Sequence, residues 1–470
     1  MKNLNIIENI LTFETKKERL KALFFRSVKS SVKIITLPVN CCKILFENKN
    51  KELIFVANGS KKIDEMCGCD ENDVKNAKCI VDILKYNPIN WQNNPNEKIC
   101  IVGERRNNKK LKSLFKTGIF DKHFSNYSEI KKYFVDFSDK YDKEKLKLCS
   151  VVICDDELFE TKYAYTRCVL KLMAMGAPLI VGDKASLEKY IPKEYMNFIG
   201  SYDDADEFVM KCEDLFYREK LSIVLRRYVM TEFGQINMSE KKKLEKISII
   251  VSTMRPENIN QLFENISLQN YPNKELILIL HGDEFDVDEI KSKTLNLAYD
   301  VRIIQKDALT IFGDNLNIGV DNATGDYITK MDDDDYYGPN HLDDIYLALH
   351  YSQATIVGKT GNFTYLEQSD VMIEFGEQAE DRWWSHLPGG TILIRTDDMK
   401  KYKFASIKKS IDAELVGRII ENGDSAYSTH RYNYIRVRHG EHTYKKDDAF
   451  FIEQSGRGER KGFDKESCFV

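Results

Sequence analysis

Short apolar runs that alternate with helical patterns constrain this chain more than any other feature of its sequence. Between about 40 and 235, runs of strand length precede segments with apolar residues at helical spacing. This alternation is typical of βαβ units, in which buried parallel strands are covered by helices. The sequence therefore predicts an α/β fold with a parallel sheet in this half, with candidate strands at 53–57, 99–103, 149–154 and 178–182.

A polar, lysine-rich stretch at 237–246 divides the chain and reads as a linker. After it, an apolar strand begins at Ile247, Pro256 suits the first position of a helix, and a second apolar run follows at 276–280. This restart predicts a second α/β domain. We expect the chain to be divided into a helical extension (1–40), a parallel-sheet domain (41–236), the linker, the second domain (247–446) and a polar, flexible tail (447–470).

Composition excludes several classes of protein. The 470 residues are 42% hydrophobic and 31% charged, which suits a globular chain of roughly two or three domains. The net charge of −4 argues against a nucleic-acid partner. No apolar run approaches the roughly 18 to 20 residues of a membrane helix, and the first residues lack a signal-peptide pattern. We therefore expect a soluble cytoplasmic protein with reduced cysteines; peripheral membrane association stays open.

Four consecutive aspartates follow the short apolar strand predicted at 327–331. In an extended backbone alternate side chains share a face, so Asp332 and Asp334 would converge while Asp333 and Asp335 point away. Converging carboxylates either raise the pKa of one of them or need a compensating cation, and hard oxygen ligands suit Mg²⁺ or Mn²⁺. Ligands of open α/β sheets bind outside the carboxyl ends of the strands. The sequence thus predicts a divalent metal site that binds nucleotide phosphates; a solvated acidic loop beside a helix N-terminus is the alternative.

Three segments together carry a family resemblance: the strand KISIIVSTMRP, the approach DNLNIGVDNATGDYITKMD and the acidic element DDDDYYGP. Through them, residues 247 to about 445 resemble glycosyltransferase family 2, whose members have the GT-A nucleotide-sugar-binding α/β fold. The resemblance implies a hexosyl- or N-acetylhexosaminyl-transferase with a nucleotide-sugar donor, Mn²⁺ or Mg²⁺, and inversion at the anomeric carbon.

The same resemblance implies roles for individual residues. Asp334 would be the principal metal ligand, with Asp332 near both the metal and the donor ribose and Asp335 supporting the pair. The donor-binding residues would be Thr253 and Arg255 at the nucleobase end, together with Asp314, Asp332 and Asp333. At 280–283 the sequence LHGD stands in place of an acidic pair, which leaves the nucleobase open.

A general base is expected at the start of the helix predicted from SIDAELVGRIIENGD, which Gly423 would end. Asp412 and Glu414 both fall in its first turn. The family places an acidic catalytic base at the start of such a helix, and Asp412 matches that position best, with Glu414 as the rival. Both acids could instead complement the helix dipole.

The segment RWWSHLPGGTILIR combines aromatic residues with glycines. Trp383 and Trp384 could bind sugar rings, while Gly389 and Gly390 would let backbone approach a ligand closely. We therefore predict that these four residues bind the acceptor; core packing is the alternative for each tryptophan.

A second candidate for the metal shell lies in YNYIRVRHGEHTYKK. Its predicted strand ends in a turn with His439 and His442, which resembles the family's His-containing loop that closes over the donor. His442 is the preferred metal ligand, and Arg438 would bind the diphosphate. A surface histidine without a ligand is the alternative.

In the amino-terminal half, residues 166–188 resemble the Rossmann-like donor-binding half of GT-B glycosyltransferases of the spore-maturation-protein type. Lys171 and Tyr163 stand where such proteins often carry glutamates. We therefore expect a degenerate, non-catalytic domain that serves acceptor binding, anchoring or assembly; a second transferase activity is the alternative. Gly176 and Glu188 match the resemblance, with a turn and a helix cap as their structural roles.

The resemblance to family 2 implies a metal-dependent inverting glycosyltransferase of polysaccharide biosynthesis, which acts on a surface glycan, a lipid-linked intermediate or a protein. A nucleotidyltransferase would need a glycine-rich phosphate loop, which STMRPEN lacks. A catalytically inactive carbohydrate-binding or scaffold protein is the non-enzyme alternative.

Overall fold

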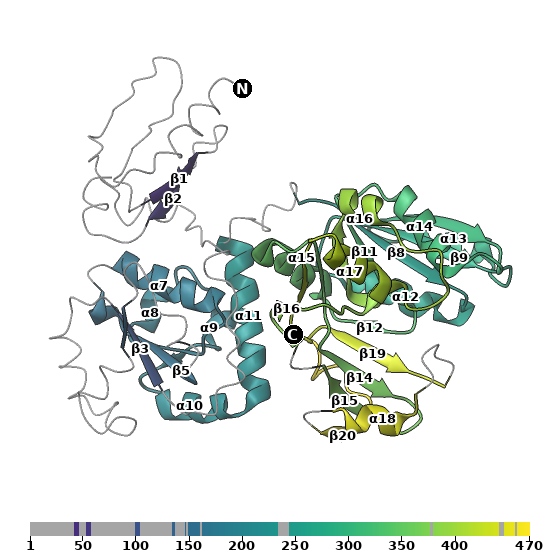
Figure 1. Ribbon diagram of the computed structural model, residues 1–470. Helices are drawn as coiled ribbons and strands as arrows, with labels where there is room; N and C mark the ends of the chain where they lie inside the picture. Colours follow the sequence, from purple (N-terminus) through teal and green to yellow (C-terminus); the bar gives the residue numbers. More distant parts are fainter. Residues whose placement is uncertain are drawn as a thin grey trace, which may run out of the picture.

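The computed structural model describes the chain in segments (Figure 1): residues 42–46, 53–57, 99–103, 134–136, 146, 149–159, 162–233, 244–376, 379–440, 446–455 and 458–470. The extension predicted for 1–40 and most of the predicted linker lie outside these residues. In the part of the chain that the structure describes, no helix has both the length and the apolar character needed to cross a bilayer.

A parallel sheet with the order β4-β3-β5-β6-β7 forms the centre of the amino-terminal half. Its strands are β3 (Ile99–Gly103), β4 (Phe134–Asp136), β5 (Val151–Cys154), β6 (Leu179–Val181) and β7 (Gly200–Ser201). The α/β fold class and three of the predicted strands are thereby confirmed. The predicted strand at 53–57 is instead part of a separate antiparallel pair, β1 (Cys42–Phe46) with β2 (Leu53–Ala57); the short connection between them allows a hairpin but not a parallel crossover.

Helices cover this sheet, and their bounds are α7 (Lys162–Ala174), α8 (Lys184–Leu187), α9 (Lys193–Met196), α10 (Ala205–Glu213) and α11 (Leu215–Phe233). Gly176 follows α7 with φ of +76°, a left-handed conformation that commonly ends a helix. A Cβ atom there would lie 3.2 Å from Cβ of Ser222 on α11. Gly176 therefore both ends α7 and lets α11 pack closely, which is the structural role that the sequence suggested.

The carboxy-terminal half is built on a mixed sheet with the order β10-β9-β8-β11-β17-β13-β18-β16. Its strands are β8 (Ile247–Thr253), β9 (Lys274–His281), β10 (Asp300–Lys306), β11 (Tyr327–Lys330), β13 (Ile356–Gly358), β16 (Arg382–Trp383), β17 (Leu393–Arg395) and β18 (Ala426–Ser428). Strands β10, β9, β8 and β11 are parallel to one another, whereas β17 runs antiparallel to β11. The carboxyl ends of β8 and β11 therefore meet at one edge of the sheet.

Six helices of this half have the bounds α12 (Ile259–Leu268), α13 (Val287–Thr294), α14 (Phe312–Asn322), α15 (His341–Ser352), α16 (Thr396–Tyr402) and α17 (Ile411–Glu421). Pro256 occupies the first position of a short 3-10 helix, Pro256–Asn258, that leads into α12, as its sequence position predicted. Gly423, with φ of +84°, follows the end of α17.

A second sheet has the order β12-β19-β14-β15-β20 and lies beside the large sheet with α18 (Figure 1). The bounds are β12 (Tyr336–Tyr337), β14 (Asn362–Leu366), β15 (Val371–Phe375), β19 (Tyr434–Arg438), β20 (Glu459–Lys461) and α18 (Asp448–Glu453). The prediction of a flexible tail from 447 onward is wrong. Strand β20 pairs with β15, and Phe451 and Cys468 are buried, because a few apolar residues pack on this sheet within an otherwise polar segment.

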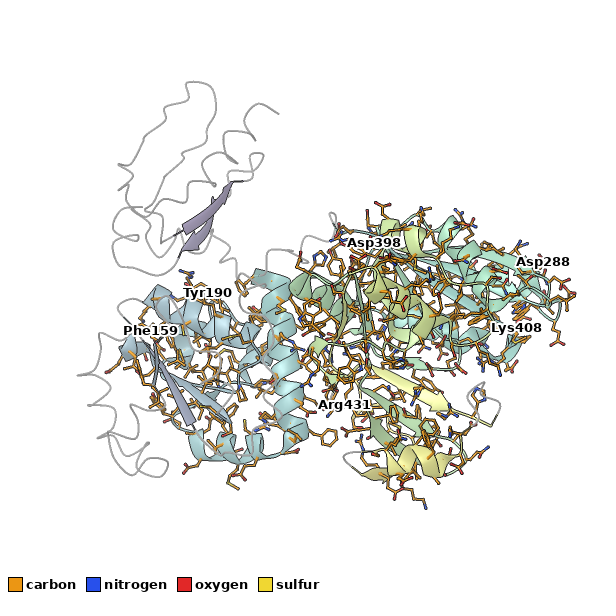
Figure 2. All side chains as sticks on the ribbon, viewed as in Figure 1. Phe159, Tyr190, Asp288, Asp398, Lys408 and Arg431 are labelled. Atoms are coloured by element: carbon orange, nitrogen blue, oxygen red, sulfur yellow. The ribbon has the colours of Figure 1, made fainter. Side chains whose placement is uncertain are left out.

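Helix α11 runs between the two halves (Figure 1) and contacts both α7 and α15. Its Glu219 is buried and accepts hydrogen bonds from Arg431 and from the hydroxyl of Tyr432. Arg431, labelled in Figure 2, is fully buried and also pairs with Glu380 at 2.8 Å and Glu374 at 3.0 Å. Burial alone would lower the pKa of Arg431, but the three glutamates outweigh it and raise that pKa. The last helix before the linker is therefore part of the core of the second half.

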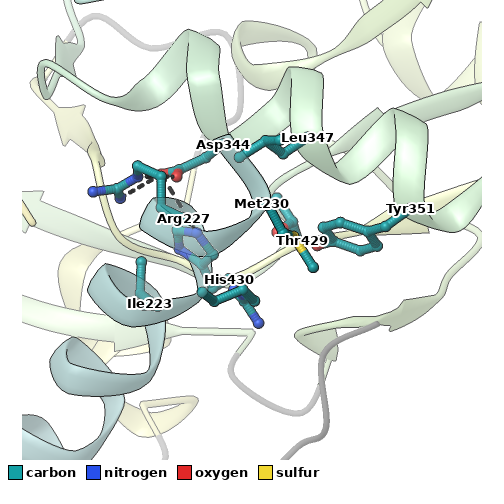
Figure 3. A pocket seen from close by; sticks show the side chains of 9 residues that line it. Ile223, Arg227, Met230, Asp344, Leu347, Tyr351, Thr429 and His430 are labelled. Carbon is teal, nitrogen blue, oxygen red and sulfur yellow. Dashed lines mark hydrogen bonds and ion pairs between the residues drawn. The ribbon is translucent and has the colours of Figure 1, made fainter. Parts of the chain in front are cut away.

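A small pocket between α11 and α15 lies at the same junction (Figure 3), with Met230 and Leu347 in its wall. Beside it, Arg227 of α11 donates from Nε to Oδ1 of Asp344 on α15 at 2.8 Å, as the dashed line marks. The halves thus meet through buried ion pairs as well as through apolar side chains.

Replacing Arg431 by methionine tests this buried junction. The substitution leaves Glu219 and Glu380 as buried carboxylates without their cation, so we expect a loss of about 3–5 kcal/mol in the free energy of unfolding. Chemical denaturation measures the loss. The matched control is Lys291→Met, because its pair with Asp288 is largely exposed and should change stability by less than about 1 kcal/mol. Equal effects of the two substitutions would contradict the structural role of Arg431.

Candidate active site

The four aspartates follow β11, where the chain bends at residues 333–335. This bend differs from the extended backbone predicted from the sequence, and it brings Asp333 and Asp334 to the guanidinium group of Arg255. Arg255 donates from Nε to Oδ2 of Asp333 at 3.0 Å and from Nη1 to Oδ2 of Asp334 at 2.8 Å. Thr253 also donates its hydroxyl to Oδ2 of Asp333 at 2.5 Å. Predicted donor-binding residues at the ends of β8 and β11 thus contact one another.

Burial raises the pKa of Asp333, although Arg255 and Thr253 act in the opposite direction. For Arg255, burial lowers the pKa, but Asp333 and Asp334 outweigh the burial and raise it above its ordinary value. Arg255 therefore stays charged and balances the negative charge of two neighbouring carboxylates at the carboxyl ends of the parallel strands.

His439 joins this cluster from the end of β19. Its Nε2 lies 2.9 Å from Oδ2 of Asp334 and 3.0 Å from Nη1 of Arg255. The sequence identified the histidine-bearing turn but preferred His442, which lies outside the described residues. The structure therefore joins the first histidine of that turn to the candidate metal ligand Asp334.

Asp335 has a different surrounding from its neighbours. Its carboxylate accepts hydrogen bonds from the hydroxyl of Tyr434 at 2.6 Å and from the amide of Val437 at 2.9 Å. It is buried, so burial raises its pKa well above the ordinary value. Asp335 therefore ties the aspartate segment to β19, and so holds the strand that carries His439.

Asp332 lies on the other side of the bend, next to a pair of glycines. Its Oδ1 accepts a hydrogen bond from Nζ of Lys330 at 2.5 Å. A Cβ atom on Gly390 would lie 2.6 Å from Oδ2 of Asp332, and one on Gly389 would lie 2.0 Å from Oδ1 of Asp412. The two carboxylates thus approach the same short 3-10 turn, Gly389–Thr391, at distances that only glycine permits.

Asp412 stands in the first turn of α17 with its carboxylate largely enclosed. Within the described residues its buried Oδ1 has no hydrogen-bond partner. Burial raises the pKa of this carboxyl, the charge of Lys330 lowers it, and Asp332 raises it again. The result is a pKa above the ordinary value, which brings the group closer to the range in which a carboxylate accepts protons efficiently.

Glu414, the rival base, is engaged elsewhere. Arg418, one helical turn later, donates from Nε to Oε1 of Glu414 at 2.5 Å and from Nη2 to Oε2 at 2.9 Å. Arg418 also donates to the carbonyl oxygens of Tyr402 and Lys403. Glu414 therefore helps to fix α17 to the segment after α16, whereas Asp412 adjoins the glycine turn.

Other predicted site residues have different surroundings. Arg438 stacks with its guanidinium carbon 4.3 Å from the ring centre of Phe451, and Asp314 accepts a hydrogen bond from the hydroxyl of Ser406. Trp383 lies on the edge strand β16 with 56% of its surface exposed, so it is not a core residue. Trp384, partly buried, pairs through its amide with the carbonyl of Ala426.

Two residues at the site were not predicted from the sequence. Lys330 is buried and pairs with Asp332; burial lowers its pKa, but the charges of Asp332 and Asp412 outweigh the burial and raise it. A lysine within the apolar run YITKM was the available signal, because a buried ammonium requires an anionic partner. Tyr337 is the other, and its hydroxyl bonds could not be read from local pattern.

Some side chains at this site are of the types that bind divalent cations. Carboxylate oxygens of Asp334 and Asp332 and the imidazole of His439 are ligand types that Mn²⁺ accepts. Across the described residues, no group of three or more His, Cys, Asp or Glu side chains is arranged to hold a metal ion. A cation that binds together with substrate phosphates needs only one or two protein carboxylates. Asp334, with the imidazole of His439 2.9 Å away, offers one such carboxylate.

Comparison with known proteins finds a family model that matches part of the carboxy-terminal half. Residues 248–397 match the family model "Glycosyl transferase family 2". Glycosyltransferase GlyA of Streptococcus pneumoniae serotype 4 is 24% identical over 166 residues, which are 34% of this chain and 23% of that protein. Glycosyltransferase GlyG of the same organism is 27% identical over 138 residues, 29% of this chain and 45% of that protein. The chain thus spans less than half the length of either relative.

Among solved structures, S. aureus TarS 1–349 is 20% identical, with a TM-score of 0.34 over 41% of this chain and 60% of that one. Mannosyltransferase PcManGT from Pyrobaculum calidifontis, in complex with GDP-Man and Mn²⁺, is 13% identical, with a TM-score of 0.34 over 42% and 58% of the two chains. The resemblance of the amino-terminal half to GT-B enzymes stays a prediction. On the family match and its glycosyltransferase relatives, the carboxy-terminal half of this chain contains a glycosyl transferase family 2 domain at residues 248–397.

Proposed function

We propose that this chain is a metal-dependent, inverting glycosyltransferase that moves a sugar from a nucleoside diphosphate to a hydroxyl of a surface glycan, lipid-linked intermediate or protein in the cytoplasm. One observation carries the proposal: the candidate donor-side carboxylate Asp332 and the candidate base Asp412 lie against the same turn, Gly389–Gly390. An inverting transfer needs a base on the side of the sugar opposite the leaving group, and this pair of carboxylates suits that arrangement.

In the proposed reaction, Asp412 accepts the proton of the acceptor hydroxyl while the hydroxyl oxygen bonds to the anomeric carbon. The bond from that carbon to the phosphate oxygen breaks, its electron pair leaves with the nucleoside diphosphate, and the configuration inverts. Lys330, which faces both Asp332 and Asp412, balances their charge. Arg255 and Thr253 fix Asp333 at the donor end. A bound Mn²⁺ or Mg²⁺, held by Asp334 and His439 with Asp332 nearby, would neutralise charge on the diphosphate.

The amino-terminal half is proposed to be non-catalytic. It is joined to the transferase half by the buried contacts of α11, which suits a domain that positions the enzyme on its acceptor or on an assembly. Its parallel sheet also ends in acidic residues, with Asp155 close to the hydroxyl of Tyr202.

A panel of nucleotide sugars tests the proposal. TarS was solved with UDP-GlcNAc and PcManGT with GDP-Man, so UDP-N-acetylglucosamine, GDP-mannose and a CDP-sugar are the donors of choice, each with Mn²⁺, Mg²⁺ or EDTA. One donor at a hundredfold excess over its Kd should stabilise the chain by about 2.7 kcal/mol, and slow release of its nucleotide should require the metal. If no donor raises the melting temperature or loses its nucleotide with either metal, the inactive binding or scaffold protein becomes the better explanation.

A further inference from the structure

The hydroxyl of Tyr337 connects two parts of the site. It accepts a hydrogen bond from the backbone amide of Asp332 at 2.8 Å and donates one to the carbonyl of Gly390 at 2.8 Å. Asp332 follows β11, whereas Gly390 belongs to the turn that adjoins Asp412. One oxygen atom thus binds both the segment on the sugar-donor side of the proposed reaction and the turn on its sugar-acceptor side.

The ring of Tyr337 is held rigidly. The residue is fully buried and lies in β12, paired with Tyr434 of β19. Its ring packs edge-on against His341 with centres 4.9 Å apart and at a tilt against Tyr434 with centres 5.4 Å apart. Its amide also donates to Oδ1 of Asn265 at 3.2 Å. Because neighbours on several elements fix the ring, the hydroxyl has a defined position to impose on its two partners.

The glycine turn is close enough to depend on this position. A Cβ atom on Gly390 would lie 3.0 Å from the Tyr337 hydroxyl and 2.6 Å from Oδ2 of Asp332. The contact is therefore tight and directional.

We infer that Tyr337 is a positioning residue for sugar transfer, whose hydroxyl sets the distance between Asp332 on the donor side and the glycine turn that adjoins Asp412 of α17. The inference rests on the proposed function. Alignment of reacting groups accounts for a large part of enzymatic rate, and a displacement of about 1 Å can cost about a hundredfold. Tyr337 touches neither reactant; it acts through the two backbone groups that it binds.

Tyr337→Phe tests the inference, because it removes one oxygen and keeps the ring. With UDP-N-acetylglucosamine and GDP-mannose as probes and Mn²⁺ present, we expect kcat for nucleotide release to fall about tenfold to hundredfold. The Kd for UDP or GDP, measured by calorimetry, should stay within about threefold, as for a loss that affects only the transition state. A merely structural role would reduce the amount of folded enzyme and leave the kcat of that folded enzyme unchanged.

The matched control is Tyr271→Phe. Tyr271 is equally buried, and its hydroxyl donates to a backbone carbonyl, that of Glu245, at 2.7 Å, away from the site. It should lose comparable stability and keep its kcat. If Tyr337→Phe fails to fold, Gly390→Ala displaces the same contact and should show the same loss of kcat.

The outcomes separate this inference from the function on which it rests. A wild-type chain that releases nucleotide from neither probe contradicts the proposed function and the inference with it. An active wild type, with Tyr337→Phe as active as Tyr271→Phe, overturns only the role of Tyr337. A parallel loss of Kd and kcat also overturns it, because the hydroxyl would then serve donor binding rather than alignment.

Discussion

Asp412→Asn is expected to reduce sugar transfer by about 10²- to 10⁴-fold, the usual contribution of a general base, and to leave donor affinity nearly unchanged. The amide keeps the shape of the side chain beside Gly389 but cannot accept the acceptor's proton. Steady-state transfer gives the rate, and calorimetry with the nucleoside diphosphate gives the affinity. Wild-type turnover in this variant would remove Asp412 from the reaction.

The dependence on pH provides an independent readout of the same base. Because burial raises the pKa of Asp412 above the ordinary value of 3.8, its basic form is lost at a higher pH than for an exposed aspartate. The rate should therefore decline on the acid side as pH falls through this raised pKa, and Asp412→Asn should abolish that decline in its residual rate.

Glu414→Gln is the matched substitution for this experiment. Glu414 is paired with Arg418 through two hydrogen bonds, so its amide variant should lose some stability and keep most of the turnover. A loss of turnover with Glu414→Gln that equals the loss with Asp412→Asn would exchange the roles of the two acids.

The second large effect is expected at Asp334. Asp334→Ala should lower the apparent affinity for Mn²⁺, measured in the presence of UDP or GDP, by at least about tenfold to hundredfold. Losses in this range are seen even for residues that only support a metal ligand. Nucleotide release should fall with it. Melting temperatures measured across a Mn²⁺ titration, with and without the nucleotide, give the affinity.

His439→Ala and Asp288→Ala complete this series. His439 contacts Asp334, so His439→Ala should lower metal affinity, but by less than Asp334→Ala does. Asp288 is exposed, and its substitution should have no effect. If nucleotide binding survives both EDTA and the double substitution of Asp332 and Asp334, the site does not use a metal.

Local sequence pattern was sufficient for the elements that create the site. The strand before the four aspartates, the helix that starts near Asp412 and the glycine that ends it all follow from apolar spacing and from helix-end residues, which act over a few positions. The structure has β11 at Tyr327–Lys330 and α17 at Ile411–Glu421, within a few residues of these expectations.

Contacts between distant segments were beyond the reach of such patterns. The bend after Met331 arises where Arg255, far earlier in the chain, binds two successive aspartates, so the predicted alternation of faces is lost. The segment after 446 is mostly polar, so its sequence predicted a flexible tail. Its few apolar residues find their partners in β15 and not in neighbouring positions, which local pattern does not reveal. Buried ion pairs of α11 likewise join residues more than a hundred positions apart.

The helix that completes both halves has a thermodynamic consequence. Two cores that share buried charges cannot melt independently without exposing those charges, so we expect a single cooperative transition across the described part of the chain. Binding of a nucleotide to the transferase half then raises the free energy of unfolding of both halves together. The amino-terminal sheet, which supplies none of the proposed donor-binding residues, should therefore melt at a higher temperature when the donor site is occupied.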